Sequence, residues 1–460
     1  MTFKQAQALL KKNGQEHLLR FWNAIDAAQQ EKLLAQIAAL DFALVAKMRA
    51  LLPSSPTPLP PSPASPVSPS TPAKVLIPSP AQRARAAALG EAALRNGEVG
   101  VVLVAGGQGT RLGFKGPKGA YPIGPVSENT PLFFYHARRV LAMSRRYGKP
   151  LPLYIMTSEA NDADTRACFE ARDFFGLPPK DVCFFKQRMW PALDPGGKII
   201  LEKPWQIFTG PNGHGGTVSA LHKTGMLADM AKRGLTTLFY FQVDNPLVEI
   251  ADPAFIGAHL RAQADYSLKL CEKRDPDEGL GVVVKRGGHY EMVEYTELTR
   301  EQKNRRAKNG DLYFKYGSVA IHLFSLAFLK KQAAVAMLLH CAHKKIPCVD
   351  ARGKCVEPAT PNGYKFEKFI FDLLPHAKNV VNLAFDRADE FSPLKNASGA
   401  DSAETCRRDL SAKAARMLKE AGVDVAPGTI LELDPCLAFA LQDLKRGVAS
   451  PAALTLATEK

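Results

Sequence analysis

The sequence lacks long apolar runs, paired cysteine motifs and blocks of basic residues. No run reaches the ~18 apolar residues that a membrane-spanning helix needs, so we expect no membrane association. The eight cysteines contain no CxxC, and the chain starts without a charged segment followed by an apolar one. These absences predict reduced cysteines and a cytoplasmic protein.

The net charge of +15 fits a nucleic acid, a membrane surface or a small polyanionic ligand. The lysines and arginines are spread along the chain, however, and do not form basic runs with interleaved aromatic residues. We therefore expect no nucleic-acid partner, and we attribute the charge to a site for polyanions and to a solvated surface.

Composition changes along the chain and indicates four segments. The first repeats apolar residues at helical spacing, which predicts two or three amphipathic helices. The second contains eleven prolines, which predicts an extended or disordered spacer or, as an alternative, a docking motif for a proline-binding module. The expected segments are an N-terminal helical segment at 1–52, a Pro/Ser-rich linker at 53–81, a main domain at 82–395 and a small, mostly helical C-terminal region at 396–460.

Strand-like apolar runs alternate with helical stretches from residue 81 onward. This alternation predicts an α/β fold with a mostly parallel sheet and helices on both faces, whose ligands bind at the carboxyl ends of the strands. The expected strands are 100–105, 151–158, 181–187, 236–245, 264–273 and 279–286, and the expected helices are 131–147, 161–175, 216–234 and 253–263. After residue 396 we expect a helix at 402–421, a strand near 425–433 and a helix through Gly447.

The segment VVLVAGGQGTRLGFKGPKG, residues 101–119, leaves the first of these strands. Its glycines allow backbone N–H groups to approach an anion, and Thr110, Arg111 and Lys118 add a hydroxyl and two cations. It does not match GxxxxGK[ST]. It does not match GxGxxG either, because Leu112 occupies the position of the last glycine of that motif. The segment therefore predicts a polyphosphate site.

This loop and ten further segments of the chain resemble segments of one protein family, and they occur in the same order as in that family. The likeness runs from residue 9 to about residue 400, interrupted by the linker, and includes GQEHLLRFW (14–22), LYIMTS (153–158), FFKQRMWPAL (184–193), GHGG (213–216), VDNPLVEIADPAFIG (243–257), PNGYKFEKFIFD (361–372) and DEFSPLKN (389–396). The chain resembles the UTP-using sugar-1-phosphate uridylyltransferases, the UDPGP family of UDP-N-acetylglucosamine pyrophosphorylases and eukaryotic-type UDP-glucose pyrophosphorylases.

The resemblance implies a Rossmann-like, glycosyltransferase-A-type mixed sheet, with 82–395 as the catalytic nucleotidyltransferase domain. It also implies that UTP and a sugar 1-phosphate react, with Mg²⁺ as cofactor, to give a UDP-sugar and pyrophosphate. Two polyanions must meet in line at the α-phosphorus, so the protein supplies positioning and positive charge and needs no nucleophile of its own.

The family's roles transfer by motif. The implied nucleotide-binding residues are Gly106, Gly107, Gly109, Thr110, Gln187 and Gly213. The implied catalytic cations are Arg111 on the β- and γ-phosphates, Lys118 on the α-phosphate and Lys395 on the sugar phosphate, and Asp244 is the implied Mg²⁺ ligand. Without the resemblance, Gln187 would be an ordinary polar residue, Asp244 part of a turn after a strand, and Lys395 a solvated lysine.

The implied sugar-binding residues are His214, Gly281, Glu294 and Ser318. The N-acetylglucosamine pattern has asparagine where this chain has His214 and Ser318, and the GHG form resembles the UDP-glucose branch. We therefore expect glucose 1-phosphate as the substrate, with N-acetylglucosamine or N-acetylgalactosamine 1-phosphate as the alternative.

A non-enzyme alternative is an inactive sugar-nucleotide-binding scaffold. The presence of Arg111, Lys118 and Lys395 favours the enzyme, because an inactive relative would lose such a cation. The C-terminal region is short, so the oligomeric state stays open, with a monomer included.

Overall fold

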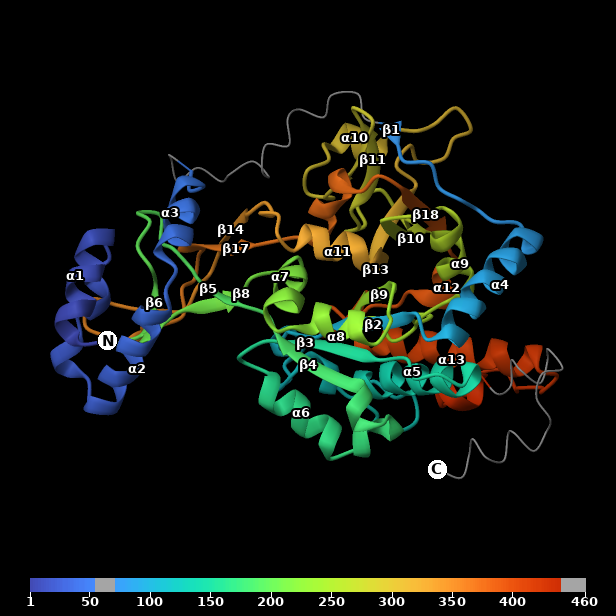
Figure 1. The fold of residues 1–460 in the computed structure, drawn as a ribbon, viewed down its shortest axis with the longest axis horizontal. Coiled ribbons are helices and arrows are strands. Elements are labelled where there is room, and N and C mark those ends of the chain that lie inside the picture. The colour runs from blue at the N-terminus through green and yellow to red at the C-terminus, as the bar shows by residue number, and fades with distance from the viewer. Residues whose placement is uncertain (54–70, 440–460) are drawn as a thin grey trace. The chain divides into compact units, whose positions relative to one another are not determined.

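Residues 1–53 and 71–439 are described by the computed structural model, and they fall into two compact units. Unit 1 contains residues 1–53, 188–216 and 336–372, and unit 2 contains residues 71–187, 217–335 and 373–439 (Figure 1). The four segments expected from composition do not coincide with these units. Within the described ranges, no helix is long and apolar enough to cross a membrane.

Unit 2 is built on a ten-stranded mixed sheet. Its main path is β1-β11-β13-β9-β2-β3-β4, while β10 pairs with β13 and β18, and β12 pairs with β11. The strands are β1 Thr71–Pro72, β2 Val99–Val104, β3 Leu153–Thr157, β4 Val182–Lys186, β9 Thr237–Gln242, β10 Tyr266–Glu272, β11 Val282–Arg286, β12 His289–Val293, β13 Tyr316–Ser325 and β18 Val380–Ala384.

The predicted α/β class and mixed sheet are confirmed, but a mostly parallel sheet is not what forms. Strands β4, β3, β2 and β9 are parallel neighbours, and β10 is parallel to β18. Strand β13 then runs antiparallel to both β9 and β10, and β11 and β12 form an antiparallel hairpin around Gly287 and Gly288, both with positive φ. Since β9 and β10 therefore point the same way, their carboxyl ends share an edge with those of β2, β3 and β4.

Helices cover both faces of the sheet (Figure 1). Ile155 of β3 packs in the same apolar core as Phe133 of α5, whereas the hydroxyl of the adjacent Tyr154 donates to Asp229 of α8 at 2.7 Å. Successive residues of a strand point to opposite faces, which places α5 and α8 on opposite sides. The helices of unit 2 are α4 Pro80–Asn96, α5 Leu132–Tyr147, α6 Asp162–Glu170, α8 Met226–Lys232, α9 Pro253–Arg261, α10 Arg300–Asn304, α11 Leu326–Gln332, α12 Arg387–Glu390 and α13 Ala403–Glu420; α7 Gly216–Lys223 begins at the last residue of a unit 1 segment.

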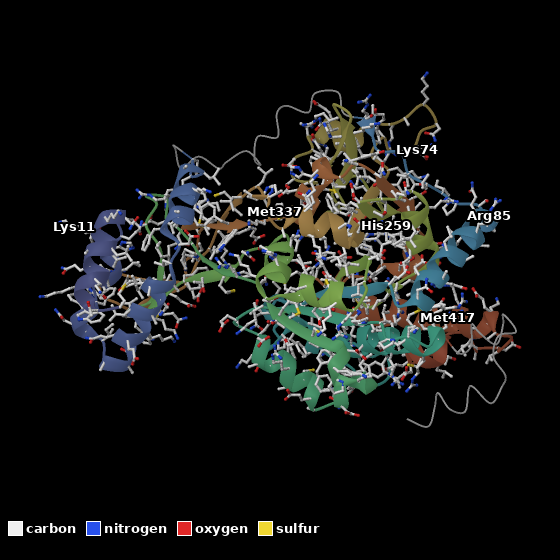
Figure 2. The ribbon with its side chains drawn as sticks, viewed as in Figure 1. Lys11, Lys74, Arg85, His259, Met337 and Met417 are labelled. Carbon is white, nitrogen blue, oxygen red and sulfur yellow. The ribbon has the colours of Figure 1, made fainter. Side chains whose placement is uncertain are left out.

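Helices α4 and α9 approach each other closely through two glycines. A Cβ at Gly90 would lie 2.0 Å from the oxygen of Pro253, and one at Gly257 would lie 1.7 Å from the oxygen of Ala86. Larger residues would push the helices apart. On α9, His259 lies among the packed side chains of unit 2, whereas Arg85 of α4 is exposed (Figure 2).

Four elements differ from the expectations. The helix expected at 161–175 ends as α6 at Glu170, and the backbone at 173–175 has positive φ. The helix expected at 216–234 is divided into α7 and α8 by Gly225, whose φ of +78° is left-handed. No strand forms at 425–433, where Pro427 and Gly428 interrupt the apolar run. At the end of the expected linker, residues 71–72 pair with β11 as an edge strand, a position that tolerates Pro72. Most of that linker, and the end of the helix expected through Gly447, lie outside the described residues.

Unit 1 joins the N-terminal helices to segments from the middle of the sequence. Leu10, Leu33 and Met48 share an apolar core with Trp190 and Tyr364. Its elements are α1 Phe3–Asn13, α2 Ala27–Ala39, α3 Phe42–Ala50, β5 Met189–Pro191, β6 Leu201–Lys203, β7 Gln206–Ile207, β8 Thr209–Pro211, β14 His340–Lys344, β15 Cys348–Val349, β16 Cys355–Val356 and β17 Gly363–Glu367. The helices expected in residues 1–52 are thus present, and they pack as part of unit 1.

Candidate active site

The loop after β2 folds back on itself at the carboxyl edge of the sheet in unit 2. The N–H of Gly109 donates to the oxygen of Gly116 at 3.0 Å, and the N–H of Lys118 donates to the oxygen of Gly107 at 3.1 Å. Thr110 and Arg111 are exposed in a 3₁₀ turn within this loop, and Arg111 forms no ion pair with any residue that the structure describes. A hydroxyl and an uncommitted guanidinium are thus presented together on one loop, as an anion site requires.

Gly106 begins the loop and touches Gln187, which follows β4. A Cβ at Gly106 would lie 2.0 Å from the amide nitrogen of Gln187, so glycine leaves the space that this side chain occupies. Gln187 is 7% exposed, and its N–H donates to the oxygen of Thr157 at 2.9 Å. Two residues predicted to bind the nucleotide are therefore in contact, although 81 positions separate them in the sequence.

Asn161 supports the same loop, although no motif in the sequence points to it. Its side-chain amide donates to the oxygens of Ala105 and Gly107 at 2.8 and 3.2 Å, and its side-chain oxygen accepts from the N–H of Ser158 at 2.8 Å. Asn161 is 1% exposed. Its only sequence signal is its place just after the motif that ends β3, because the atoms it binds are backbone carbonyls of a distant segment.

Lys118 and Asp244 meet at this edge from two different strand ends. The Nζ of Lys118 lies 3.6 Å from Oδ2 of Asp244, and both side chains are mostly buried. The residue before Asp244 is held by His136 of α5, whose Nε2 is 2.9 Å from the oxygen of Val243. Burial lowers the pKa of His136 to about 4, so its ring is neutral at pH 7 and donates this hydrogen bond.

Lys395 enters the same region through the backbone of its neighbour. The N–H of Leu394 donates to the oxygen of Asp244 at 2.8 Å, so the chain carrying Lys395 passes directly beside the residue that carries the carboxylate. The Lys395 side chain is half-buried. The three groups predicted to bind the α-phosphate, the metal and the sugar phosphate therefore occupy one region of unit 2.

The predicted sugar residues of unit 2 form a second group on the antiparallel strands. A Cβ at Gly281 would lie 3.1 Å from Oε1 of Glu294, and the N–H of Ser318 donates to the oxygen of Gly281 at 2.8 Å. A side chain at Gly281 would crowd the carboxylate, so glycine leaves Glu294 room to accept hydrogen bonds. Pairing of β11 with β12 and of Val282 with Gly317 brings the three residues together.

Gly213 and His214 belong to unit 1. The φ of Gly213 is +81°, and a Cβ there would lie 2.5 Å from the oxygen of Lys368. The Nδ1 of His214 accepts from the N–H of Ile370 at 3.2 Å, and its ring stacks on Phe369 with centroids 5.4 Å apart. Burial and, secondarily, His340 lower the pKa of His214 to about 4, so the imidazole is neutral at pH 7. The glycine is thus explained by packing inside unit 1, and the ligand roles of both residues stay predictions.

Asp244 fits the way proteins bind Mg²⁺ next to phosphates. Mg²⁺ keeps several waters and takes one or two carboxylates together with substrate phosphate oxygens. Among the described residues no group of three histidines, cysteines or carboxylates forms a complete protein cage. A single strand-end carboxylate beside Lys118 matches a metal bound largely through phosphate.

Comparison with known proteins gives the family of the chain. The family model described as UTP–glucose-1-phosphate uridylyltransferase (UDPGP) matches residues 77–423. The UDP-N-acetylhexosamine pyrophosphorylase-like protein 1 of Homo sapiens is 38% identical over 436 residues, which cover 91% of this chain and 86% of that protein. The UDP-N-acetylglucosamine pyrophosphorylase of Saccharomyces cerevisiae is 36% identical over 370 residues, covering 78% and 77%.

A solved structure extends the likeness to the fold. The uridine diphosphate N-acetylglucosamine pyrophosphorylase of Trypanosoma brucei, in complex with an inhibitor, superposes with a TM-score of 0.78 at 28% identity, covering 98% of this chain and 95% of that one. Because the family model matches well over half of the chain and the relatives exceed 30% identity across most of it, the chain belongs to the UTP–glucose-1-phosphate uridylyltransferase family of UDP-sugar pyrophosphorylases.

Proposed function

We propose that this protein makes a UDP-N-acetylhexosamine and pyrophosphate from UTP and an N-acetylhexosamine 1-phosphate. The observation that carries the proposal is the pair of Lys118 and Asp244, 3.6 Å apart at the sheet edge where the glycine loop ends. A cation and a carboxylate this close provide one group for a phosphate oxygen and one for a metal that neutralises the same phosphate.

The choice of sugar departs from the expectation of glucose. That expectation depended on His214 and Ser318, which stand where the N-acetylglucosamine pattern has asparagine. The relatives reported above are named for N-acetylhexosamine or N-acetylglucosamine, and they match most of this chain, which supports the amino sugar. A serine at 318 is smaller than asparagine and still carries a hydroxyl that can donate to or accept from a sugar substituent.

The chemistry needs charge and alignment. The oxygen of the sugar phosphate attacks the α-phosphorus of UTP, and pyrophosphate leaves on the opposite side, so every group acts by position. Arg111, exposed and without an ion-pair partner in the described residues, binds the departing phosphates. Lys118 neutralises the α-phosphate, and Lys395 holds the attacking sugar phosphate.

Asp244 is the residue that would hold Mg²⁺, which, when bound, neutralises phosphate charge. Gly106, Gly107 and Gly109 let the backbone approach UTP, and Gln187 offers both a donor and an acceptor to the uracil edge. Glu294 accepts hydroxyl hydrogens of the sugar, as a carboxylate beside a glycine can.

The test is pyrophosphate release with UTP, MgCl₂ and one sugar 1-phosphate at a time. N-acetylglucosamine and N-acetylgalactosamine 1-phosphates should react with a higher kcat/KM than glucose and galactose 1-phosphates. A preference for glucose would return the assignment to the expectation from His214 and Ser318. No release with any of the four, from protein that binds UDP-N-acetylglucosamine in calorimetry, would favour the inactive scaffold.

A further inference from the structure

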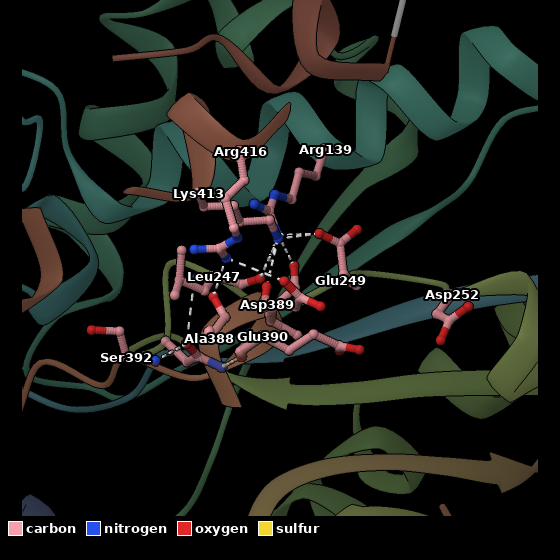
Figure 3. A network of polar contacts seen from close by, with 12 residues as sticks. Arg139, Leu247, Glu249, Asp252, Ala388, Asp389, Glu390, Ser392, Lys413 and Arg416 are labelled. Atoms are coloured by element: carbon pink, nitrogen blue, oxygen red, sulfur yellow. Dashed lines mark hydrogen bonds and ion pairs between the residues drawn. The ribbon is translucent and has the colours of Figure 1, made fainter. Parts of the chain in front are cut away.

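Two chain segments that are distant in sequence lie side by side behind the proposed phosphate site. One is the turn after β9, from Asp244 to Glu249, and the other runs from Ala388 to Lys395. Lys413 of α13 donates to the oxygen of Leu247 at 3.2 Å and to the oxygen of Asp389 at 2.6 Å, so it ties the two segments together at the end away from Lys395 (Figure 3).

Asn245 joins the same segments at the end near the site. Its amide nitrogen donates to the oxygen of Glu390 at 2.6 Å, and its amide oxygen accepts from the N–H of Ser392 at 3.1 Å. The same oxygen lies 3.3 Å from the N–H of Leu247, within its own turn. Asn245 is 4% exposed, so water cannot replace these bonds.

The segment that carries Lys395 has no regular secondary structure after α12. Its bonds outside the Asp244 turn run to residues 401–409: the N–H of Lys395 donates to the oxygen of Asp401 at 2.7 Å, and the hydroxyl of Ser392 donates to Asp409 at 2.8 Å. Helix α12 ends at Glu390, and residues 391–395 lie in neither a helix nor a strand. Between them and Asp244 there is one backbone bond, from the N–H of Leu394. A shift of one residue along this segment would move Lys395 by about 3 Å, enough to lose a phosphate contact.

Only a carboxamide of this length makes both bonds. Asn245 must donate to one backbone carbonyl and accept from a backbone N–H two residues further along. Aspartate has nearly the same shape but no donor, so its carboxylate would face the oxygen of Glu390 and would add a second negative charge beside Asp244.

We propose that Asn245 is a positioning residue that sets the register of the segment carrying Lys395 against Asp244, and so fixes the distance between the sugar-phosphate cation and the metal-binding carboxylate. The inference depends on the proposed function for the roles of Lys395 and Asp244. The register itself is a property of the fold and can be measured without turnover.

The kinetic test compares Asn245→Asp with a matched variant, Asn382→Asp. Asn382 of β18 is 2% exposed, and its amide likewise donates to a backbone oxygen, that of Lys74 at 3.2 Å. Both variants lose a buried bond to a carbonyl. Asn245→Asp should lower kcat/KM for the sugar 1-phosphate by roughly 30-fold, the order expected for a displaced catalytic group, with the KM for UTP changed less than about threefold. Asn382→Asp should leave both values within about threefold.

A double-mutant cycle with Lys395→Ala tests whether Asn245 acts through Lys395. In the Lys395→Ala background, Asn245→Asp should lower kcat/KM for the sugar 1-phosphate by a further factor of less than about three, because the side chain that Asn245 positions is gone. Equal losses in both backgrounds, or no loss in the single variant, would overturn the inference. Asn245→Ser provides a second variant, because serine is too short to reach both partners. It should also lower kcat/KM for the sugar 1-phosphate.

Hydrogen exchange decides the register independently of activity. In Asn245→Asp the amides of Ser392 and Leu394 should exchange at least tenfold faster than in the wild type, while the amides of α13 keep their rates. In Asn382→Asp all amides of the segment that carries Lys395 should exchange as in the wild type. Unchanged exchange at both amides would refute the inference. If the wild type releases no pyrophosphate, the proposed function fails, and the exchange result still shows whether Asn245 holds the segment.

Discussion

The parallel and antiparallel halves of the sheet in unit 2 build their parts of the candidate site in different ways. In the parallel half, β2, β4 and β9 each end at the same edge, and the residues that follow them meet there. In the antiparallel half, Gly281, Glu294 and Ser318 come together through cross-strand pairing of β11 with β12 and β13. In the proposed function, the first half presents loops to the phosphates, and the second presents side chains from strand ends to the sugar.

Charge neutralisation and the choice of sugar should therefore respond to different mutations. If the parallel half binds the phosphates, as proposed, it acts on atoms that all the substrates share, so damage there should slow the reaction of every sugar 1-phosphate equally. If the antiparallel half binds the sugar, as proposed, damage there should change the ratio of kcat/KM values between different sugar 1-phosphates. Four predictions test this division, beginning with the largest expected effect.

Asp244→Asn should lower kcat by about 10³-fold with every sugar 1-phosphate, because a neutral amide is a poor Mg²⁺ ligand and cannot offset Lys118. The backbone bond from the N–H of Leu394 stays, so the variant should fold. The measurement is steady-state pyrophosphate release across a MgCl₂ titration, with thermal unfolding as the control. Turnover within threefold of the wild type at every Mg²⁺ concentration would contradict the metal role, and EDTA should abolish wild-type activity.

Glu294→Gln should lower kcat/KM for the sugar 1-phosphate about 10- to 100-fold, since a hydrogen bond to a charged group is lost, and should leave the KM for UTP unchanged. The matched control is Glu291→Gln on the same hairpin, whose carboxylate pairs with Arg286 at 3.3 Å. Initial rates with each substrate varied separately give the two constants. An equal rise in the KM for UTP would show that the two halves do not divide the substrate as argued.

Gly106→Ala should raise the KM for UTP about tenfold, because the new methyl would occupy the position of the Gln187 amide, 2.0 Å away, and turn that side chain aside. Stability should change little, since the displaced atoms are the end of a flexible side chain. Gly210→Ala in β8 is the control, because a Cβ there would meet Lys365 only at an ordinary contact distance of 3.8 Å. Both KM values come from initial rates. Equal values for the two variants would remove Gln187 from the uracil site.

Local sequence predicted the parallel half well and the supporting residues poorly. The loop from Gly106 to Lys118 and the strand end at Asp244 are contiguous motifs, so glycine freedom and charge could be seen directly. Asn161 and Asn245 were missed because their partners are backbone carbonyls and N–H groups of distant segments. Every residue has a backbone carbonyl, so no sequence pattern predicts these contacts before the fold is known.

The antiparallel half shows the other limit. Gly281, Glu294 and Ser318 were predicted through the resemblance, but their contact depends on the register of three strands, which periodicity does not give. Likewise, the helical spacing in residues 1–52 predicted helices, while their partners Trp190 and Tyr364 became visible only in the packed core of unit 1. The spacing of apolar residues shows which face of a helix is buried, but it does not show which segment packs against that face.

Acid should weaken both halves alike, because each contains a buried neutral histidine. His136 contacts the oxygen of Val243 beyond β9, and His259 lies 2.7 Å from the hydroxyl of Ser267 on β10. Burial lowers the pKa of each to about 4, whereas in the unfolded chain the value is 6.5. Protons therefore bind the unfolded state first, so the stability is complete above pH 6.5 and falls as the pH drops towards 4.

Between pH 6.5 and 5.5 each histidine should cost about 1 kcal/mol of unfolding free energy. Urea unfolding of the wild type and of His259→Asn at both pH values measures this, and the variant should lose less stability on acidification by that amount. His136→Asn should show the same reduction, because the cause is burial and not the chemistry of either half. A variant whose pH dependence equals that of the wild type would mean that its histidine is protonated in the folded protein. In that case the hydrogen bond from His136 to Val243 would survive acidification, because the protonated ring keeps its Nε2 proton.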